Sequence, residues 1–213
     1  MLVGNPNVGK SALFTALTGR YVAVSNYPGT TVEIARGTLG SNGESRPVID
    51  TPGVRSIVPL SDDERVARDI LLDDGSATVV QVADAKNLRR ALLLTLELSD
   101  AGLPLVLALN MSDEAADRGI TVDAERLSAI LGVPVVPTVA TRRLGTHELA
   151  RQLPDARPVS RAVTFAHPIG SAVRRIEGLL PTSGLRAQSL SLMLLSGDEG
   201  LADRLGLSPE AKA

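Results

Sequence analysis

The segment that most constrains the fold of this chain is G-N-P-N-V-G-K-S, which begins at Gly4. It fits the pattern G-x-x-x-x-G-K-[ST], follows a short apolar stretch and precedes a stretch with helical periodicity. In that setting the glycines let backbone N–H groups approach phosphate oxygens, and the helix N-terminus favours the anion. The segment therefore predicts a strand, a phosphate-binding loop and a helix in succession. The alternative is a glycine-rich turn that binds nothing.

Individual positions of this loop have distinct expected roles. The ammonium group of Lys10 is expected to reach the β- and γ-phosphates, and the hydroxyl of Ser11 to ligate Mg²⁺. The other nucleotide contacts predicted in this segment are Gly4, Asn5, Pro6, Asn7, Val8, Gly9 and Ala12.

Short apolar runs alternate with helical periodicity through most of the chain. Strands are expected at residues 1–3, 33–39, 47–49, 77–83, 105–109 and 134–139, and helices at 11–18, 62–72, 88–101, 123–131 and 146–153. This alternation is typical of an α/β fold with a mostly parallel sheet and helices on both faces. The third of these helices is expected to pack on the core through Leu88, Ala91, Leu92 and Leu96.

The pattern changes after residue 153, where three prolines interrupt the chain and helical pieces follow at 169–180 and 185–195. We expect one domain at residues 1–155 and a small, partial helical domain at 156–213. Both ends look cropped, because the first strand is short and a helix that starts at Ser208 has no room to continue. The apolar residues of the last helical piece need a partner surface, either on the main domain or beyond this chain; they are Leu190, Leu192, Met193, Leu194 and Leu195.

A second motif, D-T-P-G, begins at Asp50 directly after an apolar run. Asp50 is therefore expected at the C-terminal end of a strand, where open α/β sheets bind ligands. We expect Asp50 to join the magnesium shell and Gly53 to offer an unhindered N–H to a γ-phosphate. Taken alone the segment could be an ordinary strand-to-turn junction, but its spacing from Lys10 leaves room for one helix, one loop and one strand.

A third motif, N-M-S-D, closes the apolar run at 105–109. The carboxylate of Asp113 can accept hydrogen bonds from the N1–H and the amine of guanine, a pattern that adenine does not offer. Asn110 is expected to brace this loop, and a backbone N–H of residues 138–140 to meet the guanine O6. The alternative is an Asx turn that caps the next segment, but the order of all the motifs favours a base site. The predicted set is completed by Met111, Thr138, Val139 and Ala140.

The loop at residues 20–33 is too polar and rich in turn residues to be core. In a magnesium nucleotide site, such a loop can supply a second hydroxyl ligand that senses the γ-phosphate. Gly29, Thr30 and Thr31 are the nucleotide contacts predicted here. Physical reasoning alone leaves open which threonine is the ligand.

Composition excludes several other functions. With 22 Lys+Arg against 24 Asp+Glu, a net charge of −2 and 2% aromatic residues, the chain lacks both the basic field and the stacking platforms of nucleic-acid-binding proteins. The absence of cysteine excludes disulfides and thiolate metal sites. The longest uncharged stretches are too short to span a membrane. His147 and His167 are expected to be structural or surface residues and not iron ligands.

Together these motifs resemble a Ras-like P-loop GTPase and, in detail, the N-terminal cytosolic domain of the bacterial ferrous iron transport protein B family. The resemblance rests on G-N-P-N-V-G-K-S, N-Y-P-G-T-T-V-E from Asn26, V-A-R-D from Val66, N-M-S-D with Met111 where most GTPases have lysine, and V-P-V-V-P-T-V-A from Val133. It implies a GTP- and GDP-binding switch that hydrolyses GTP slowly and regulates ferrous iron transport. It also implies that Thr31 is the magnesium-sensing threonine.

The resemblance further implies that the C-terminal helices strengthen nucleotide binding, like a release inhibitor, and connect to a transmembrane pore that is absent here. The parent protein would lie at the cytoplasmic face of the bacterial inner (plasma) membrane, with this fragment expected to be soluble. No nucleic-acid partner is expected, and a homo-oligomer is left open.

Two positions depart from the usual patterns. Val54 stands where Ras-type enzymes carry the glutamine that orients water, and an aliphatic side chain cannot hydrogen-bond water. The resemblance implies that K⁺, held by Asn7 and by carbonyls of residues 26–30, takes part instead. Thr51 stands where the family usually has leucine, with little expected consequence. The residues predicted to act in hydrolysis are therefore Asn7, Lys10, Thr31 and Gly53.

Two alternatives remain at this stage. A ribosome- or tRNA-associated GTPase shares the motifs, but the chain lacks a basic RNA-binding appendage. A module that binds GTP without significant turnover is suggested by Val54. Turnover in KCl compared with NaCl distinguishes this module from the potassium-stimulated enzyme.

Overall fold

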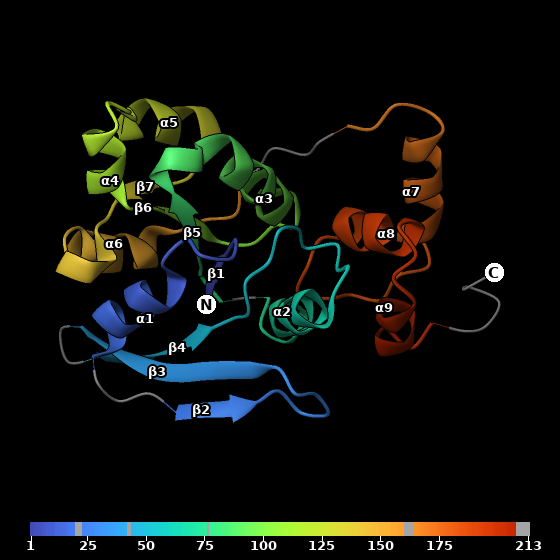
Figure 1. Ribbon diagram of the computed structural model, residues 1–213. Helices are drawn as coiled ribbons and strands as arrows, with labels where there is room; N and C mark the ends of the chain where they lie inside the picture. The colour runs from blue at the N-terminus through green and yellow to red at the C-terminus, as the bar shows by residue number, and fades with distance from the viewer. Residues whose placement is uncertain (20–22, 42–43, 76, 160–163, 208–213) are drawn as a thin grey trace.

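The computed structural model describes residues 1–19, 23–41, 44–75, 77–159 and 164–207. The strands in this part of the chain form one sheet in the order β2-β3-β4-β1-β5-β6-β7 (Figure 1). β1 is parallel to β4 and β5, and β6 to β5 and β7, whereas β3 is antiparallel to β2 and β4. The predicted mostly parallel α/β sheet is confirmed. The strands are β1 (Leu2–Gly4), β2 (Ala23–Asn26), β3 (Glu33–Ser41), β4 (Glu44–Asp50), β5 (Val79–Asp84), β6 (Leu105–Asn110) and β7 (Val135–Pro137).

Helices cover both faces of this sheet. Successive residues of a strand point to opposite faces; on β6, Val106 and Ala108 pack in the core beneath α1 and α6, and Leu105 and Leu107 in the core beneath α2, α3 and α5. Both faces are therefore apolar, as in other parallel sheets with helices on each side. The helices are α1 (Lys10–Thr18), α2 (Asp62–Asp73), α3 (Leu88–Asp100), α4 (Ser112–Asp117), α5 (Ala124–Leu131), α6 (Thr146–Gln152), α7 (Ile169–Glu177), α8 (Ala187–Leu195) and α9 (Glu199–Arg204), with 3-10 turns η1 (Ala85–Asn87), η2 (Ala140–Arg142) and η3 (Leu153–Asp155).

The core face of α3 differs in part from the prediction. Ala91 is buried as predicted, but Leu96, which was also expected in the core, is 51% exposed, and the other buried positions are Leu94, Thr95, Leu98 and Ser99. Leucine occupies both sides of this helix, so three- and four-residue spacing fits more than one face. Contact with β5 decides between them, since the buried Gln81 donates from Nε2 to the Ala91 carbonyl at 2.8 Å.

The region before β3 also differs from the prediction, which has a loop throughout residues 20–33. Residues Ala23–Asn26 form the edge strand β2, antiparallel to β3. All four of its residues are exposed. Its sequence, A-V-S-N, does not alternate apolar and polar residues, so only the backbone pairing defines this strand. The short helices α4 and α9 were likewise not foreseen.

Among the C-terminal helices, α8 lies beside α3, α9 lies beside α2, and α7 packs against α8 on the side away from the sheet (Figure 1). Leu190 and Met193 of α8 are 0% and 1% exposed and join the core formed with α2 and α3. The partner surface that the apolar α8 requires is therefore the main domain, although Leu195 remains 46% exposed. The helix expected from Ser208 lies outside the described residues. Within the described part, no helix combines the length and apolarity needed to cross a bilayer.

The backbone after α2 and the backbone before α8 approach each other closely at a pair of glycines. A Cβ placed on Gly75, just after α2, would lie 2.3 Å from the Cα of Gly184, in the turn before α8. Any side chain at Gly75 would therefore separate these two backbones.

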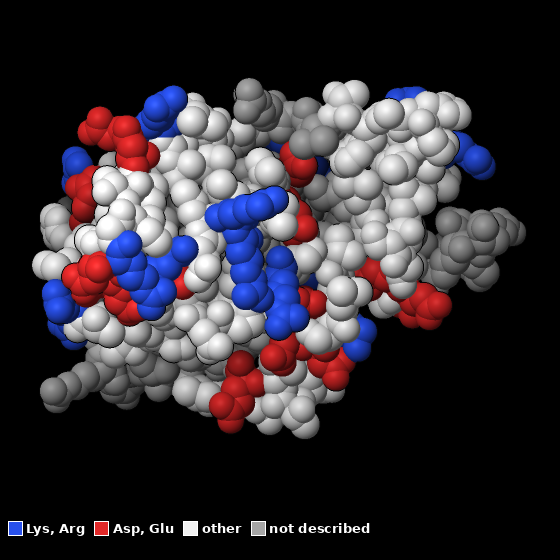
Figure 2. Space-filling view, turned by 45° about the horizontal axis from the view of Figure 1, so that its top comes forward, with Lys and Arg blue, Asp and Glu red and all other residues white. Residues whose placement is uncertain are grey.

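Charged side chains of both signs are interspersed over one face of the molecule, with a short band of basic side chains near its centre (Figure 2). On the face shown, the surface has no extended field of a single sign. This distribution agrees with the near-neutral net charge of −2.

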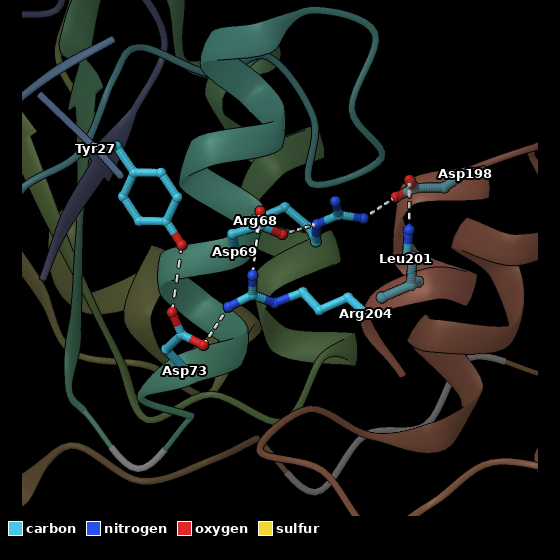
Figure 3. Close-up of polar contacts among 7 residues, drawn as sticks. All are labelled: Tyr27, Arg68, Asp69, Asp73, Asp198, Leu201 and Arg204. Carbon is cyan, nitrogen blue, oxygen red and sulfur yellow. Dashed lines mark hydrogen bonds and ion pairs between the residues drawn. The ribbon is translucent and has the colours of Figure 1, made fainter. Parts of the chain in front are cut away.

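The V-A-R-D motif connects α2 to the C-terminal helices. Arg68 is 3% exposed; its Nη1 pairs with Asp198 Oδ2, and its Nε with Asp69 Oδ1 at 2.7 Å (Figure 3). Asp198 also caps α9 by accepting from the Leu201 N–H at 3.1 Å. A buried ion pair therefore joins α2 to the N-terminus of α9.

A second, more exposed contact joins the same helices. Arg204 of α9 pairs with Asp73 of α2 and lies 3.5 Å from Asp69 Oδ2. The other carboxylate oxygen of Asp73 accepts a hydrogen bond from the Tyr27 hydroxyl at 3.4 Å (Figure 3). Asp73 of α2 thus contacts both α9 and the loop that follows β2.

Candidate functional site

The segment from Gly4 to Ser11 connects the C-terminal end of β1 to the N-terminus of α1. Gly9 has a φ of 80°, and a Cβ there would lie 2.4 Å from Asn110 Nδ2. A Cβ on Gly4 would lie 2.4 Å from the Val82 carbonyl oxygen. The two glycines of the motif are therefore required by left-handed backbone geometry and by close packing.

A pocket of about 380 Å³ opens at this loop. It combines the predicted phosphate loop with Gly53 of the second motif. Gly53 offers a backbone N–H that has no acceptor among the described residues, and a Cβ placed on Gly53 would lie 3.1 Å from the Cα of Pro6. The lining residues are Asn5, Pro6, Asn7, Gly9, Lys10, Ser11, Ala12, Gly53 and Asp63.

Two of these lining residues, Lys10 and Ser11, converge on the carboxylate of Asp50. Lys10 Nζ pairs with Asp50 Oδ1, and Ser11 Oγ donates to Asp50 Oδ2 at 2.9 Å. Asp50 is held there because β4 ends beside β1, with Leu2 and Asp50 in register. The two motifs separated by forty residues therefore meet at one carboxylate.

The donor set at Asp50 fits Mg²⁺. Mg²⁺ prefers oxygen ligands, and the Ser11 hydroxyl and the Asp50 carboxylate, which are hydrogen-bonded to each other at 2.9 Å, bring two such oxygens together. Among the described residues, no cluster of three or more His, Cys, Asp or Glu side chains forms a protein-only metal site. Mg²⁺ is commonly bound through one or two protein oxygens together with water and phosphate oxygens, so the Ser11 and Asp50 pair fits this ion.

Asn110 braces the neighbouring loops, as expected. Its Nδ2 donates to the Val8 carbonyl at 2.9 Å, and its Oδ1 accepts from the Ala140 N–H at 3.0 Å and the Thr138 hydroxyl at 3.2 Å. Asn110 is 2% exposed. One buried amide therefore fixes the phosphate loop relative to residues 138–140.

The backbone N–H groups of residues 138–140 are already engaged within the chain. Thr138 N donates to Leu109 O at 2.9 Å, Val139 N to Leu144 O at 3.0 Å, and Ala140 N to Asn110. The predicted bond to a guanine O6 would therefore require one of these bonds to be exchanged.

Asp113 lies in the first turn of α4 with its side chain partly exposed. Its Oδ1 accepts from the Glu114 N–H at 2.9 Å, and its Oδ2 lies 3.7 Å from Arg142 Nη1 on η2. The carboxylate therefore faces the segment that follows β7, on the same side of the sheet as Asn110.

The loop that carries Gly29, Thr30 and Thr31 does not line the pocket. The Thr30 hydroxyl donates to the Tyr27 carbonyl at 2.9 Å and accepts from the Val32 N–H at 3.2 Å, so it stabilises the local turn. Thr31 is exposed, and its hydroxyl has no partner among the described residues. Of the two threonines, Thr31 is the one with an unengaged hydroxyl, but this structure does not bring it to Ser11 and Asp50.

Val54 is directed away from the pocket. It is 2% exposed and packs in the core, while its N–H donates to Gly4 O at 2.9 Å and its carbonyl accepts from Asn5 Nδ2 at 3.1 Å. This buried, apolar side chain therefore offers no hydrogen-bonding group to the pocket. Asn5 gains a structural role that the motif alone did not reveal.

The segment after Gly53 is held by two glutamates that the sequence analysis missed. Glu64 accepts from the N–H groups of Arg55 at 3.1 Å and Leu60 at 2.9 Å. Glu97 of α3 accepts from the Ser56 hydroxyl at 3.1 Å and the Ile57 N–H at 2.8 Å, and burial raises its pKa. Glu64 lies in an acidic helix start and Glu97 in a leucine-rich helix, so no local pattern identifies either role.

Asp63 is the other missed residue, and it enters the pocket because the segment before α2 folds back toward the phosphate loop. Its only sequence signal is its place in the acidic first turn of α2. His147 and His167 are both exposed, as expected.

A sequence model described as ferrous iron transport protein B matches residues 1–153. The chain belongs to this family. It is 36% identical over 205 residues to the Fe(2+) transporter FeoB of Escherichia coli (strain K12), which covers 92% of the chain and 26% of that protein. The chain therefore spans about a quarter of the length of the curated FeoB relatives it matches.

Solved FeoB structures share the fold. The cytosolic domain of L. pneumophila FeoB has a TM-score of 0.87 at 34% identity, over 95% of this chain and 83% of that one. The cytosolic domain of T. maritima FeoB in GMPPNP form has a TM-score of 0.85 at 34% identity, over 99% and 88%. The Ras-like fold inferred from the motifs is thus confirmed.

Proposed function

We propose that this chain binds guanine nucleotides and hydrolyses GTP to GDP and phosphate, as the switch domain of a FeoB-type ferrous iron transporter. The observation that carries this proposal is the convergence of Lys10, Ser11 and Asp50 beneath a loop that Asn110 ties to the base-binding side. The T. maritima FeoB domain solved in GMPPNP form supports it, because its fold and family are the same.

The proposed chemistry assigns a role to each group in the pocket. Bound Mg²⁺ supplies positive charge that offsets the charge on the transferring phosphoryl group. Ser11 and Asp50 would hold the ion, and Lys10, now paired with Asp50, would bind the β- and γ-phosphates. When the loop at residues 26–31 closes over the pocket, the Gly53 N–H would meet the γ-phosphate, and the Thr31 hydroxyl would join Ser11 and Asp50 as a magnesium ligand.

We also propose that K⁺ stimulates hydrolysis through Asn7. Asn7 lies in the pocket wall with a φ of 65°, is exposed, and has a side chain that bonds no described residue. Its amide oxygen is therefore available as a ligand. Since Val54 is buried and apolar, charge at the scissile bond needs another cation.

The division into a nucleotide domain at 1–155 and a release-inhibiting helical part at 156–213 belongs to the same proposal. The FeoB relatives are roughly three to four times as long as this chain, and we propose that its partner is the membrane-embedded remainder of the parent protein, at the cytoplasmic face. A module that binds GTP without turnover is the second candidate, and the burial of Val54 favours it.

Measurement of phosphate release from GTP in KCl and in NaCl, with ATP as the control substrate, tests the proposal. We expect phosphate release from GTP and not from ATP. The rate of release from GTP is expected to be well above the NaCl rate when the salt is KCl. Asn7→Ala is expected to abolish the K⁺ effect while leaving GTP binding nearly intact. Comparable affinities for ATP and GTP would refute the nucleotide assignment, and equal rates in both salts would refute the role of K⁺.

A further inference from the structure

The loop that carries Asp113 lacks a positive charge of its own, because Met111 stands where most GTPases have lysine. Met111 has a left-handed backbone with a φ of 59°, and the end of its side chain lies at the phosphate loop. Its Cε would lie 3.4 Å from a Cβ placed on Gly9, so the thioether reaches the phosphate loop itself. The position is therefore in contact with the nucleotide site but carries no charge.

A lysine from the neighbouring strand lies beside that thioether. β5 and β6 are parallel with Asp84 opposite Asn110, so η1 after β5 lies next to the residues that follow Asn110. Lys86 Nζ on η1 is 3.2 Å from Met111 Sδ, 2.6 Å from Glu114 Oε2 and 3.5 Å from Asp84 Oδ1. Its side chain is only 9% exposed.

The ammonium group of Lys86 is held from two sides. Asp84, which also accepts from the Lys86 N–H at 2.9 Å, belongs to the end of β5, whereas Glu114 belongs to α4. Hydrogen bonding to Glu114 raises the pKa of Lys86, so the group stays charged at neutral pH. A thioether is a weak acceptor, so these carboxylates and not Met111 determine where the charge lies.

We propose that Lys86 is a positioning residue of the guanine nucleotide site: it supplies, from the β5–α3 junction, the positive charge that Met111 lacks, and holds residues 111–113 against the phosphate loop. The inference rests on the proposed function. It assigns a role in nucleotide binding to a residue outside the GTPase motifs. Because the charge sits at the end of the Met111 side chain, a lysine introduced at 111 would place its own ammonium group in the same region.

The first test measures the rate at which a fluorescent GDP analogue dissociates. Lys86→Met removes the charge but keeps most of the stem, and the rate is expected to rise by roughly 10-fold, the lower end of what one charge-assisted hydrogen bond contributes. Lys86→Arg is expected to recover most of the loss. Arg90→Met is the matched control, since Arg90 is an exposed cation in the first turn of the adjacent α3. Equal rates for Lys86→Met and Arg90→Met would overturn the proposal.

The second test introduces Met111→Lys in both backgrounds. In the unaltered chain it is expected to speed dissociation, because two ammonium groups then share one region. In Lys86→Met it is expected to slow dissociation and restore a rate within about threefold of the original. A general loss of stability would not reverse sign in this way, so an effect of the same sign in both backgrounds would overturn the proposal. Absence of GDP binding by the unaltered chain would refute the proposed function, and this inference with it.

Discussion

The buried ion pair between Arg68 and Asp198 makes a specific prediction about stability. Arg68→Ala removes a guanidinium that is 3% exposed and leaves the Asp198 carboxylate, whose side chain is 5% exposed, without its ionic partner. Breaking a buried pair by removing one member costs about 3 to 5 kcal/mol, chiefly because the remaining charge stays desolvated. We expect about 3 kcal/mol, since Asp198 keeps its capping bond to the Leu201 N–H.

Equilibrium unfolding in urea, followed by circular dichroism, measures this loss. With a slope of about 2 kcal/mol per molar urea, 3 kcal/mol lowers the midpoint by ~1.5 M. Arg65→Ala is the matched control on the same helix, because Arg65 makes an exposed ion pair with Asp62, and its midpoint is expected to stay where it was. Arg68→Met combined with Asp198→Asn, which removes both charges and keeps a capping oxygen, should recover most of the midpoint. A shift for Arg68→Ala no larger than that for Arg65→Ala would refute the reasoning.

Three further outcomes are expected. Asp113→Ala should reduce the preference for GTP over ATP, which in the unaltered chain could reach roughly 10⁴ for a site built to hydrogen-bond the base; competition binding with both nucleotides measures it, and an unchanged preference would contradict the assignment. Lys10→Ala should weaken Mg²⁺–GTP binding by at least tenfold without altering the circular dichroism, since it removes a fixed charge from the phosphates; a folded variant with full affinity would exclude the predicted role. Burial raises the pKa of Glu97, so the folded state binds the proton of Glu97 more tightly than the unfolded chain does. The contribution of Glu97 to stability therefore falls as the pH rises from the ordinary glutamate range through the raised pKa. As the pH rises through that range, the urea midpoint should fall less steeply for Glu97→Gln than for the unaltered chain. The same pH dependence in both proteins would show that another group titrates.

Much of the site could be predicted from local sequence because its parts are backbone features at strand ends. The phosphate loop, Asp50 and Asn110 each follow an apolar run, and parallel pairing then brings those ends together. By contrast, the partners that hold the segment after Gly53 come from distant helices. Glu97 lies forty residues beyond Ile57, and neither residue type nor spacing marks the contact.

The errors in the fold have a similar cause. A leucine-rich helix such as α3 offers apolar side chains in several directions, so the sheet and not the periodicity selects its buried face. β2 is an exposed edge strand whose pairing uses the backbone, which every sequence provides. The meaning of V-A-R-D also required the structure, because Arg68 meets a residue 130 positions later in the chain.

The glycine pair at the end of α2 has a mechanical consequence. The twelve residues of α2 make a rod about 18 Å long, with Asp63 in the pocket at one end and Gly75 just beyond the other. Because Gly75 meets Gly184 backbone to backbone, no side chain lies between them to absorb displacement by changing rotamer. A displacement of α2 along its axis is therefore transmitted directly to the turn before α8. A rotation of α2 away from α9 would instead separate Arg68 from Asp198.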